Sequence, residues 1–460
     1  MRSTMKIKNK ILQLLAPQTL FLIFAIAVGG LLIFINPPFE TPDEGSHFKR
    51  AYQISEGKIL AEKKDWDSGG NIPKGLNQIE SFFRSWLADK NNATSFKEIS
   101  EQTKNKIGDE KEFASFPNTA LYSPIPYLPQ IIGISVAKLF SDSLLWIFYF
   151  GRIFNLLFYL AIVFLAIKMT PILKWIFLIL ALMPMSIFLA ASASPDALTI
   201  ALSFLFIAYI LKLSLGQKTL AKVDLGLLLI LTIAISLCKT AYLFLPLLIL
   251  IIPRDKFASI KEDYLFKSLI ITAGFVAGIG WYAIANKFFV PILAGIDPKA
   301  QLAVILSKPL SYCKFLVYHG LRWFSGSNSQ SIIGEFGWLD TYLPLWIISS
   351  YKLALIVVFL SEEKEREIAT LGKIISFLIF SATAFVITLI MYLTWNTVGS
   401  FKVEGLQGRY FLPLLPLLFI SLYGGYSKTS KKLNLKYLVP IFLLVVFYVT
   451  LKTLLYRYYF

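Results

Sequence analysis

The segment NPPFETPDEGSHFKR, residues 36–50, concentrates acids, prolines, a histidine and two cations directly after an apolar run. On a helix that begins near Asp43, the side chains of Asp43, His47 and Arg50 fall at i, i+4 and i+7 and share one face. Glu44 lies on an adjacent stripe. A carboxylate beside a histidine and an arginine could take a proton from a hydroxyl group, or two carboxylates could bind a divalent cation such as Mg²⁺ or Mn²⁺. Capping of the helix by Asp43 is the structural alternative.

Three other charged side chains interrupt apolar runs. Asp196 follows a proline in ASASPDAL and could cap the next helix or face a site. Lys239, in SLCKTAY, is a cation between two apolar segments, which indicates either a functional position or a long stem that reaches the membrane surface. Arg409, in GLQGRYFLP, suits a phosphate because its planar guanidinium can engage two oxygens. The alternative for Arg409 is an anchor at the membrane interface.

Aromatic and acidic residues also occur together in GEFGWLDTYLP, residues 334–344. Glu335 and Asp340 could orient an acceptor or a cation, and Trp338 could stack on a sugar ring. Tyr122, in LYSPIPYLPQ, is a second candidate for sugar stacking. A turn that leads into a helix is the alternative reading of residues 334–344.

The composition indicates how these residues must be positioned. The chain has 460 residues, of which 56% are hydrophobic and 16% charged, and its mean hydropathy is +0.64. A soluble domain could not bury so much apolar surface, so we expect an all-α polytopic membrane protein. The net charge of +17 does not indicate nucleic-acid binding, because most lysines and arginines lie in short links between apolar runs. Two cysteines predict no disulfide framework.

The positive-inside rule orients about eleven expected transmembrane helices, within a range of 10–13. Residues 1–17 form the cytoplasmic N-terminus and residues 18–35 the first span. The further spans are expected near 143–167, 172–192, 197–214, 223–238, 240–252, 268–286, 344–360, 373–393, 409–425 and 437–456. Because residues 121–140 are apolar but contain three prolines, we expect them to be re-entrant or interfacial.

The expected spans divide the chain into a few parts. Residues 36–142 form a large extracytoplasmic loop with juxtamembrane helices, and residues 287–343 form a second one. Residues 143–286 and 344–460 form two parts of a transmembrane bundle. This topology brings Asp43, Asp196, Lys239, Glu335 and Arg409 to the outer face, so we expect residues from separate segments to converge in one pocket beside the lipid.

A set of motifs adds a resemblance. The segments PPFETPDEGSHFKRAYQIS, YSPIPYLPQ, MPMSIFLAASASPDAL, LCKTAYLFLP, FGWLDTYLP and GLQGRYFLPLLPL occur in this order. Together they resemble a family of bacterial polytopic membrane proteins, formerly of unknown function, which is grouped with the GT-C glycosyltransferases. The resemblance covers almost the whole chain. It implies a GT-C-like fold, a polyprenyl-phosphate sugar as donor, and an acidic motif in the first outer loop, here Asp43 and Glu44. The acids are adjacent rather than separated by one residue, so the resemblance does not establish metal dependence.

On this basis the sequence predicts a glycosyltransferase of the bacterial plasma membrane, with an inverting mechanism and an extracytoplasmic site. The acceptor would be a cell-envelope glycan, lipid or protein, and no nucleotide cofactor is expected, because no Gly-rich phosphate loop is visible. Asp43 is the predicted general base and Glu44 its neighbour in catalysis or cation binding. The donor phosphate would be held by Arg409, Lys239 and Arg50. The residues that would orient the acceptor or a cation are Asp196, His47, Glu335 and Asp340.

Two other functions stay open. A transporter or flippase of a lipid-linked saccharide would place charges at mid-bilayer and would have two similar halves. Here the polar residues gather at one face, which favours an enzyme. A non-catalytic membrane protein of polysaccharide assembly is the third possibility.

Overall fold

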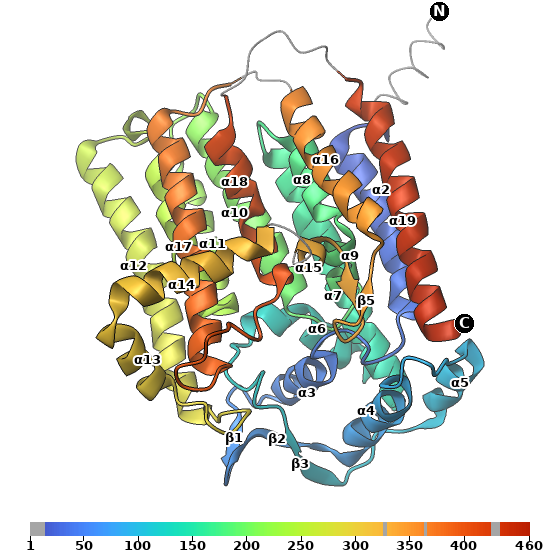
Figure 1. Cartoon of the computed structure of the whole chain (residues 1–460). Coiled ribbons are helices and arrows are strands. Elements are labelled where there is room, and N and C mark those ends of the chain that lie inside the picture. Colours follow the sequence, from blue (N-terminus) through green and yellow to red (C-terminus); the bar gives the residue numbers. More distant parts are fainter. Residues whose placement is uncertain (1–13, 325–328, 363–365, 425–432) are drawn as a thin grey trace, which may run out of the picture.

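The computed structural model describes residues 14–324, 329–362, 366–424 and 433–460 (Figure 1). Most of the predicted cytoplasmic N-terminus, 1–17, lies outside these residues. In these residues the protein is mostly helical, and six of their helical segments are long and apolar enough to cross a membrane. These are α2 (Pro17–Ile35), α7 (Leu144–Met169), α10 (Asp196–Leu215), α12 with η6 (Ile260–Phe288), α17 (Thr370–Thr394) and α19 (Leu435–Tyr459). The chain is therefore an α-helical membrane protein.

The described residues contain six helices of this length, so the predicted number of about eleven spans is not confirmed. The run predicted as one span at 172–192 is broken into α8 (Lys174–Ala181) and α9 (Pro184–Ala190). Proline has no N–H to continue a helix and fits its first turn, so Pro184 starts a new helix after two residues. Nearly all side chains of α8 and α9 are buried. This apolar run is thus part of the protein core, as expected for short apolar helices.

Other predicted spans are also short. Residues 240–252 form 3-10 turns, η3 (Thr240–Tyr242) and η4 (Leu245–Ile251), and the region of 409–425 begins as η9 (Gly408–Leu414) and continues as α18 (Leu415–Leu422). The remaining helices of the bundle are α11 (Lys222–Cys238) and α16 (Leu345–Ser361). Interruptions of the α-helical backbone at such positions leave polar side chains beside apolar helices.

Residues 36–143 form a separate unit between α2 and α7, which we call the first-loop lobe. It lies below the long helices in Figure 1. Its helices are α3 (Glu44–Ser55), α4 (Lys74–Leu87), α5 (Phe96–Glu101) and α6 (Leu128–Ala137). An antiparallel sheet joins β1 (Glu62–Lys64), β2 (Asp67–Pro73) and β3 (Lys111–Ser115) in the order β1-β2-β3.

The sheet differs from the all-α prediction. It could not be predicted from the sequence, because β2 carries no alternating hydrophobic pattern. Its sequence is DSGGNIP, and two glycines let it approach its neighbours closely. A Cβ at Gly69 would lie 1.8 Å from the carbonyl oxygen of Ala114, and one at Gly70 would lie 2.2 Å from Gln53 Nε2. Close backbone approach, rather than periodicity, therefore produces this strand.

The segment 121–140, predicted as re-entrant or interfacial, contains η2 (Ile125–Tyr127) and the ten-residue α6. A helix of this length extends about 15 Å, too short to cross a bilayer core. It packs closely on α7, because a Cβ at Gly133 would lie 2.3 Å from the carbonyl oxygen of Phe150. The side chain of Gln130 also donates to Asn155 of α7.

The segment 287–343 contains α13 (Pro298–Ser307), α14 (Pro309–Leu321), α15 (Gln330–Ile333) and a hairpin of β4 (Glu335–Phe336) and β5 (Thr341–Tyr342). This hairpin contacts the first-loop lobe, since Trp338 Nε1 donates to the carbonyl of Phe39. The end of α19 contacts the same lobe: Arg457 donates to the carbonyl of Leu87, and Phe96 stacks on Tyr459. The lobe is thus held against the bundle from several sides.

Candidate functional site

Four charged residues from four distant segments form a chain of ion pairs. Arg409 Nη2 lies 3.1 Å from Asp43 Oδ2, and Arg409 Nε lies 3.3 Å from Asp196 Oδ2. Lys239 Nζ lies 3.3 Å from Asp196 Oδ1. We call these four residues the Arg409 cluster. All four were candidates from the sequence, and the structure brings them together.

Each member of the Arg409 cluster lies where a helix begins or ends. Asp43 precedes α3, Asp196 is the first residue of α10, and Lys239 follows α11. Arg409 lies in η9, where Gly408 is required because a Cβ would meet the backbone nitrogen of Ile332 at 2.4 Å. Breaks in the helices therefore place charged side chains beside apolar segments without forcing them into the middle of a span.

Aromatic side chains surround the Arg409 cluster. Lys239 Nζ lies 4.0 Å from the ring centre of Tyr410 and 5.7 Å from that of Tyr122. His47 Nδ1 lies 2.8 Å from the hydroxyl of Tyr127, and its ring is edge-on to Tyr122. Tyr122, a candidate for sugar stacking, therefore lies beside the cluster in a cation–π contact.

His47 is neutral at physiological pH. Burial lowers the pKa of His47 to about 4, although the carboxylates of Asp43 and Asp196 act in the opposite direction. The imidazole can therefore accept or donate a hydrogen bond but contributes no positive charge. With two cations and two carboxylates, the Arg409 cluster is then electrically neutral.

The capping explanations of the two aspartates do not hold. Asp43 occupies the N-cap position of α3, but its side chain makes no capping hydrogen bond and its backbone is left-handed, with φ 62°. A left-handed conformation is unfavourable for a residue other than glycine and is often found at functional sites. Its other oxygen, Oδ1, accepts a hydrogen bond of 2.9 Å from Asn118. Asp196 is the first residue of α10 and not its N-cap, which is Pro195.

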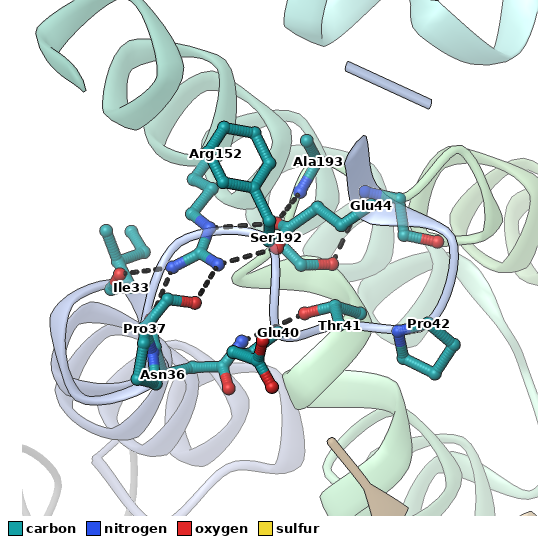
Figure 2. Close-up of polar contacts among 12 residues, drawn as sticks. Ile33, Asn36, Pro37, Glu40, Thr41, Pro42, Glu44, Arg152, Ser192 and Ala193 are labelled. Atoms are coloured by element: carbon teal, nitrogen blue, oxygen red, sulfur yellow. Dashed lines mark hydrogen bonds and ion pairs between the residues drawn. The ribbon is translucent and has the colours of Figure 1, made fainter. Parts of the chain in front are cut away.

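Glu44 points away from the Arg409 cluster and binds a different arginine. Arg152 Nε and Nη2 donate to the two oxygens of Glu44 at 2.8 and 2.7 Å, and both side chains are fully buried. Arg152 also donates to the carbonyls of Ile33, Asn36 and Pro37, at 2.7–3.0 Å (Figure 2). The backbone N–H of Ala193 donates to Glu44 Oε1 at 2.8 Å.

These contacts correct the predicted role of Glu44. Both of its oxygens are engaged by Arg152 and Ala193, so Glu44 has no free oxygen for an acceptor or a metal. Asp43 is engaged by Arg409 and Asn118. Among the residues that the structure describes, no group of three or more His, Cys, Asp or Glu side chains could hold a metal ion. The donor set predicted for a divalent cation, Asp43 with Glu44, therefore does not fit this arrangement.

Four other predicted residues also lie outside the Arg409 cluster. Arg50, one helical turn beyond His47, is fully buried. Its two Nη atoms donate to Gln53 and to the carbonyls of Ile59 and Tyr122, while its Nε has no hydrogen-bond partner among the described residues. The other three belong to the 334–344 segment. Trp338 is covered by the guanidinium of Arg84 at 3.4 Å, Asp340 pairs with Arg457 at 3.3 Å, and Glu335 lies in β4.

An open groove of about 650 Å³ lies at the other end of α3. It is lined by residues that include Tyr52, Glu56, Lys111, Lys138 and Phe140. Its central charges are paired with one another, since Glu56 lies 2.7 Å from Lys111 and 3.6 Å from Lys138. The groove shares no lining residue with the Arg409 cluster. Because its central charges are paired with one another, they are less available to bind a ligand.

Sequence reasoning did not identify Arg152, Asn118 or Tyr410. For Arg152 a signal was present, because an arginine inside the apolar run of α7 marks a buried partner or a functional position. Asn118 and Tyr410 carry no such signal, since asparagine in a loop and tyrosine near a membrane surface are ordinary. Only their distances to Asp43 and Lys239 identify them.

A comparison with known families shows which family this chain resembles. The model of a family described as predicted membrane protein (DUF2142) matches residues 26–418. The match includes all members of the Arg409 cluster as well as Arg152 and Glu44. No curated protein and no solved structure matches the chain.

Proposed function

The chain belongs to this family of predicted membrane proteins, and on that premise we propose that it is a GT-C-type glycosyltransferase. It moves a sugar from a polyprenyl-phosphate carrier to a cell-envelope glycan, lipid or protein. The reaction takes place at the extracytoplasmic face of the bacterial plasma membrane. The Arg409 cluster is its active site.

One observation carries the proposal: a partly exposed carboxylate lies against a buried guanidinium beside apolar helices. The side chain of Asp43 is 24% exposed, whereas that of Arg409 is 3% exposed. Transfer from a lipid phosphate requires a base that an acceptor can reach and a cation that meets the leaving phosphate. Asp43 and Arg409 supply these two groups at contact distance.

Arg409 and Lys239 are the groups that stabilise the leaving phosphate. As the glycosidic bond breaks, negative charge grows on the phosphate oxygens, and cations fixed in a site of low dielectric stabilise it strongly. The forked guanidinium of Arg409 can engage two oxygens. Lys239 is 20% exposed and held between two tyrosine rings, so its ammonium can reach a third oxygen.

Asp43 acts as general base on the acceptor hydroxyl. The proton moves to the Asp43 carboxylate as the hydroxyl oxygen bonds to the anomeric carbon and the phosphate leaves. A positioned base of this kind contributes about 10²–10⁴-fold in rate. Asp196 is the permanent counterion that keeps both cations in place, since it contacts Lys239 and Arg409 from one side.

The donor's polyprenyl tail requires contact with lipid-facing helices. Helix α12 exposes apolar side chains along its length, among them Val276, Ile279 and Tyr282. Because α12 packs against α11, which ends beside Lys239, a tail on this side of the bundle could deliver its phosphate to the cluster.

The test is a transfer assay. Purified protein in liposomes receives a radiolabelled polyprenyl-phosphate sugar and a cell-envelope fraction as acceptor, and wild type is compared with Asp43→Asn. We expect the variant to lose about 10²–10⁴-fold in rate. Asp340→Asn is the matched control, because Asp340 is also paired with an arginine but lies outside the cluster.

The outcomes separate the alternatives. Equal rates for wild type and Asp43→Asn would exclude Asp43 as the base. If the labelled lipid changes leaflet while no sugar reaches an acceptor, the protein is a transporter of lipid-linked saccharide and the proposal is wrong.

A further inference from the structure

The two carboxylates that flank Arg409 are held with unequal strength. Asp196 has a side chain that is 8% exposed, and it contacts two cations, Arg409 and Lys239. Asp43 is 24% exposed and contacts one cation at 3.1 Å. Its left-handed backbone adds conformational strain at the same residue. Asp43 is therefore the carboxylate that can leave Arg409 more easily.

Arg409 has unused hydrogen-bonding capacity. Its Nε lies 3.3 Å from Asp196 but has no aligned hydrogen-bond acceptor among the described residues. Its Nη1 reaches the carbonyl of Pro42 only at 3.4 Å. A buried guanidinium with long contacts gains more from a well-placed oxyanion than one whose donors are saturated.

The charges of the Arg409 cluster limit how an anion can bind. Two cations and two carboxylates already balance, and His47 is neutral, so one more negative charge would be buried without a partner. Such a charge is costly in a site shielded from water. An oxyanion can therefore bind Arg409 only if one carboxylate withdraws, and Asp43 is the one that reaches solvent.

We propose that a phosphate-type oxyanion displaces Asp43 from Arg409, so that binding of the anionic substrate releases the Asp43 carboxylate for its acceptor. The inference rests on the proposed function, in which Asp43 is the base. Before binding, the Asp43 carboxylate is paired with Arg409 and is therefore not free for the acceptor hydroxyl. After exchange, Asp43 keeps the hydrogen bond from Asn118, which holds it on the same side of the site. Asn118 is thus a positioning residue.

The exchange predicts that Asp43→Asn increases the affinity for an anion, although it removes a residue of the site. Removing the competing charge with Asp43→Asn should tighten anion binding by about fivefold or more, the equivalent of a salt bridge worth about 1 kcal/mol. Arg409→Gln should weaken binding at least as much. Asn118→Ala should leave anion binding unchanged and lower the rate of transfer at saturating donor.

The experiment is calorimetric titration of purified protein in detergent with farnesyl phosphate and, separately, with inorganic phosphate. Wild type, Asp43→Asn, Arg409→Gln and the control Asp340→Asn are compared. Binding of both anions indicates that the headgroup alone drives exchange, whereas binding of farnesyl phosphate alone indicates a lipid-anchored phosphate; tighter binding to Asp43→Asn supports the exchange in either case. Weaker or unchanged binding to Asp43→Asn overturns it.

The titration is independent of the transfer assay. If wild type transfers no sugar but Asp43→Asn binds anions more tightly, the exchange stands as a property of an anion site and the proposed reaction fails. If wild type transfers sugar while Asp43→Asn binds anions no better, the reaction stands and the exchange fails.

Discussion

Two adjacent acids, Asp43 and Glu44, meet two different buried arginines in this protein. Glu44 binds Arg152, and Asp43 binds Arg409. The first pair is fully buried and the second reaches solvent through Asp43. Two consecutive residues thus lie in different environments, one shielded from solvent and one partly exposed to it.

The hydrogen bonds of the two arginines explain the difference. All five N–H groups of Arg152 have acceptors, at 2.7–3.0 Å, and three of the acceptors are carbonyls at the end of α2. Arg409 makes contacts of 3.1–3.4 Å and leaves its Nε without an aligned acceptor in the described part of the chain. A saturated guanidinium stabilises a fold, whereas an unsaturated one can bind a ligand.

Arg152 therefore acts at a distance on the Arg409 cluster. It fixes the end of α2 and, through Glu44, the backbone of Ala193, which is three residues before Asp196. Figure 2 shows the Arg152 and Glu44 contacts that join the segment before Asp43 to Ala193, in the segment before Asp196. The first two of the four predictions below test the contrast between these two arginines, and the other two test residues near them in the fold or the sequence.

The largest effect is expected for Arg152→Gln. The substitution leaves Glu44 buried without a cation, which typically costs about 3–5 kcal/mol. We expect a strong fall in the thermal midpoint of the detergent-purified protein, together with loss of the monodisperse peak in size-exclusion chromatography. A midpoint close to that of wild type would show that Arg152 and Arg409 do not differ as described.

Arg409→Gln should show the reverse pattern. We expect sugar transfer to fall at least about 100-fold, in the range typical for loss of one group that stabilises transition-state charge. The thermal midpoint should fall less than half as far as in Arg152→Gln, because Asp43 can turn to solvent and Asp196 keeps Lys239. Parallel melting curves and transfer rates measure both quantities. A fall in stability equal to that of Arg152→Gln would contradict the prediction.

A third acid of the same segment provides a pH test. Burial raises the pKa of Glu40 to about 7 from 4.5, although Arg457 and Arg84 oppose the shift and Asp340 adds to it. Its oxygen Oε2 lies 3.3 Å from the hydroxyl of Tyr458. The native state therefore keeps the proton between pH 4.5 and about 7, while the unfolded state has lost it. The contribution of Glu40 is greatest below pH 4.5 and is lost as the pH rises to about 7.

Glu40→Gln should remove this dependence. As the pH rises from about 5 to about 8, we expect the thermal midpoint of the variant to increase relative to that of wild type. His47 acts in the opposite direction, because burial lowers its pKa to about 4 and its contribution is lost as the pH falls. Since His47 is present in both proteins, the difference between their midpoints isolates Glu40. A difference that stays constant with pH would contradict the expected titration.

The smallest effect is expected for Glu335→Gln. Glu335 was a candidate from the sequence, but it lies in the short hairpin β4–β5 and forms no part of the Arg409 cluster. Surface substitutions of this kind change stability by at most about 0.5 kcal/mol. We expect transfer within about twofold of wild type, and a larger loss would extend the active site to this hairpin.

The sequence predicted the members of the Arg409 cluster better than their neighbours. Asp43, Asp196, Lys239 and Arg409 were recognisable because each is a charge at the edge of an apolar run. Glu44 was assigned to the same site because it is adjacent to Asp43, but its partner lies 108 positions away in α7. Adjacency in the chain does not determine which arginine a side chain meets.

The role predicted for the 334–344 segment likewise depended on contacts with distant segments. Trp338 and Asp340 suggested a sugar site, yet their partners are Arg84 and Arg457, from the first-loop lobe and the last helix. No local pattern encodes contacts between such distant segments. The sheet of the first-loop lobe was also unpredicted, because its central strand is built on glycines and not on alternating apolar residues.

The amino-acid sequence alone determined that this is a helical membrane protein, because so many apolar side chains avoid water only if they contact lipid or pack in a large core. It also determined that most lysines and arginines lie in short links between apolar runs, where water can solvate their charge. The tertiary structure decided which apolar runs belong to the core, as in α8 and α9, and which acid meets which arginine. Those outcomes depend on distances of a few ångströms between segments far apart in the chain, and hydropathy carries no information about them.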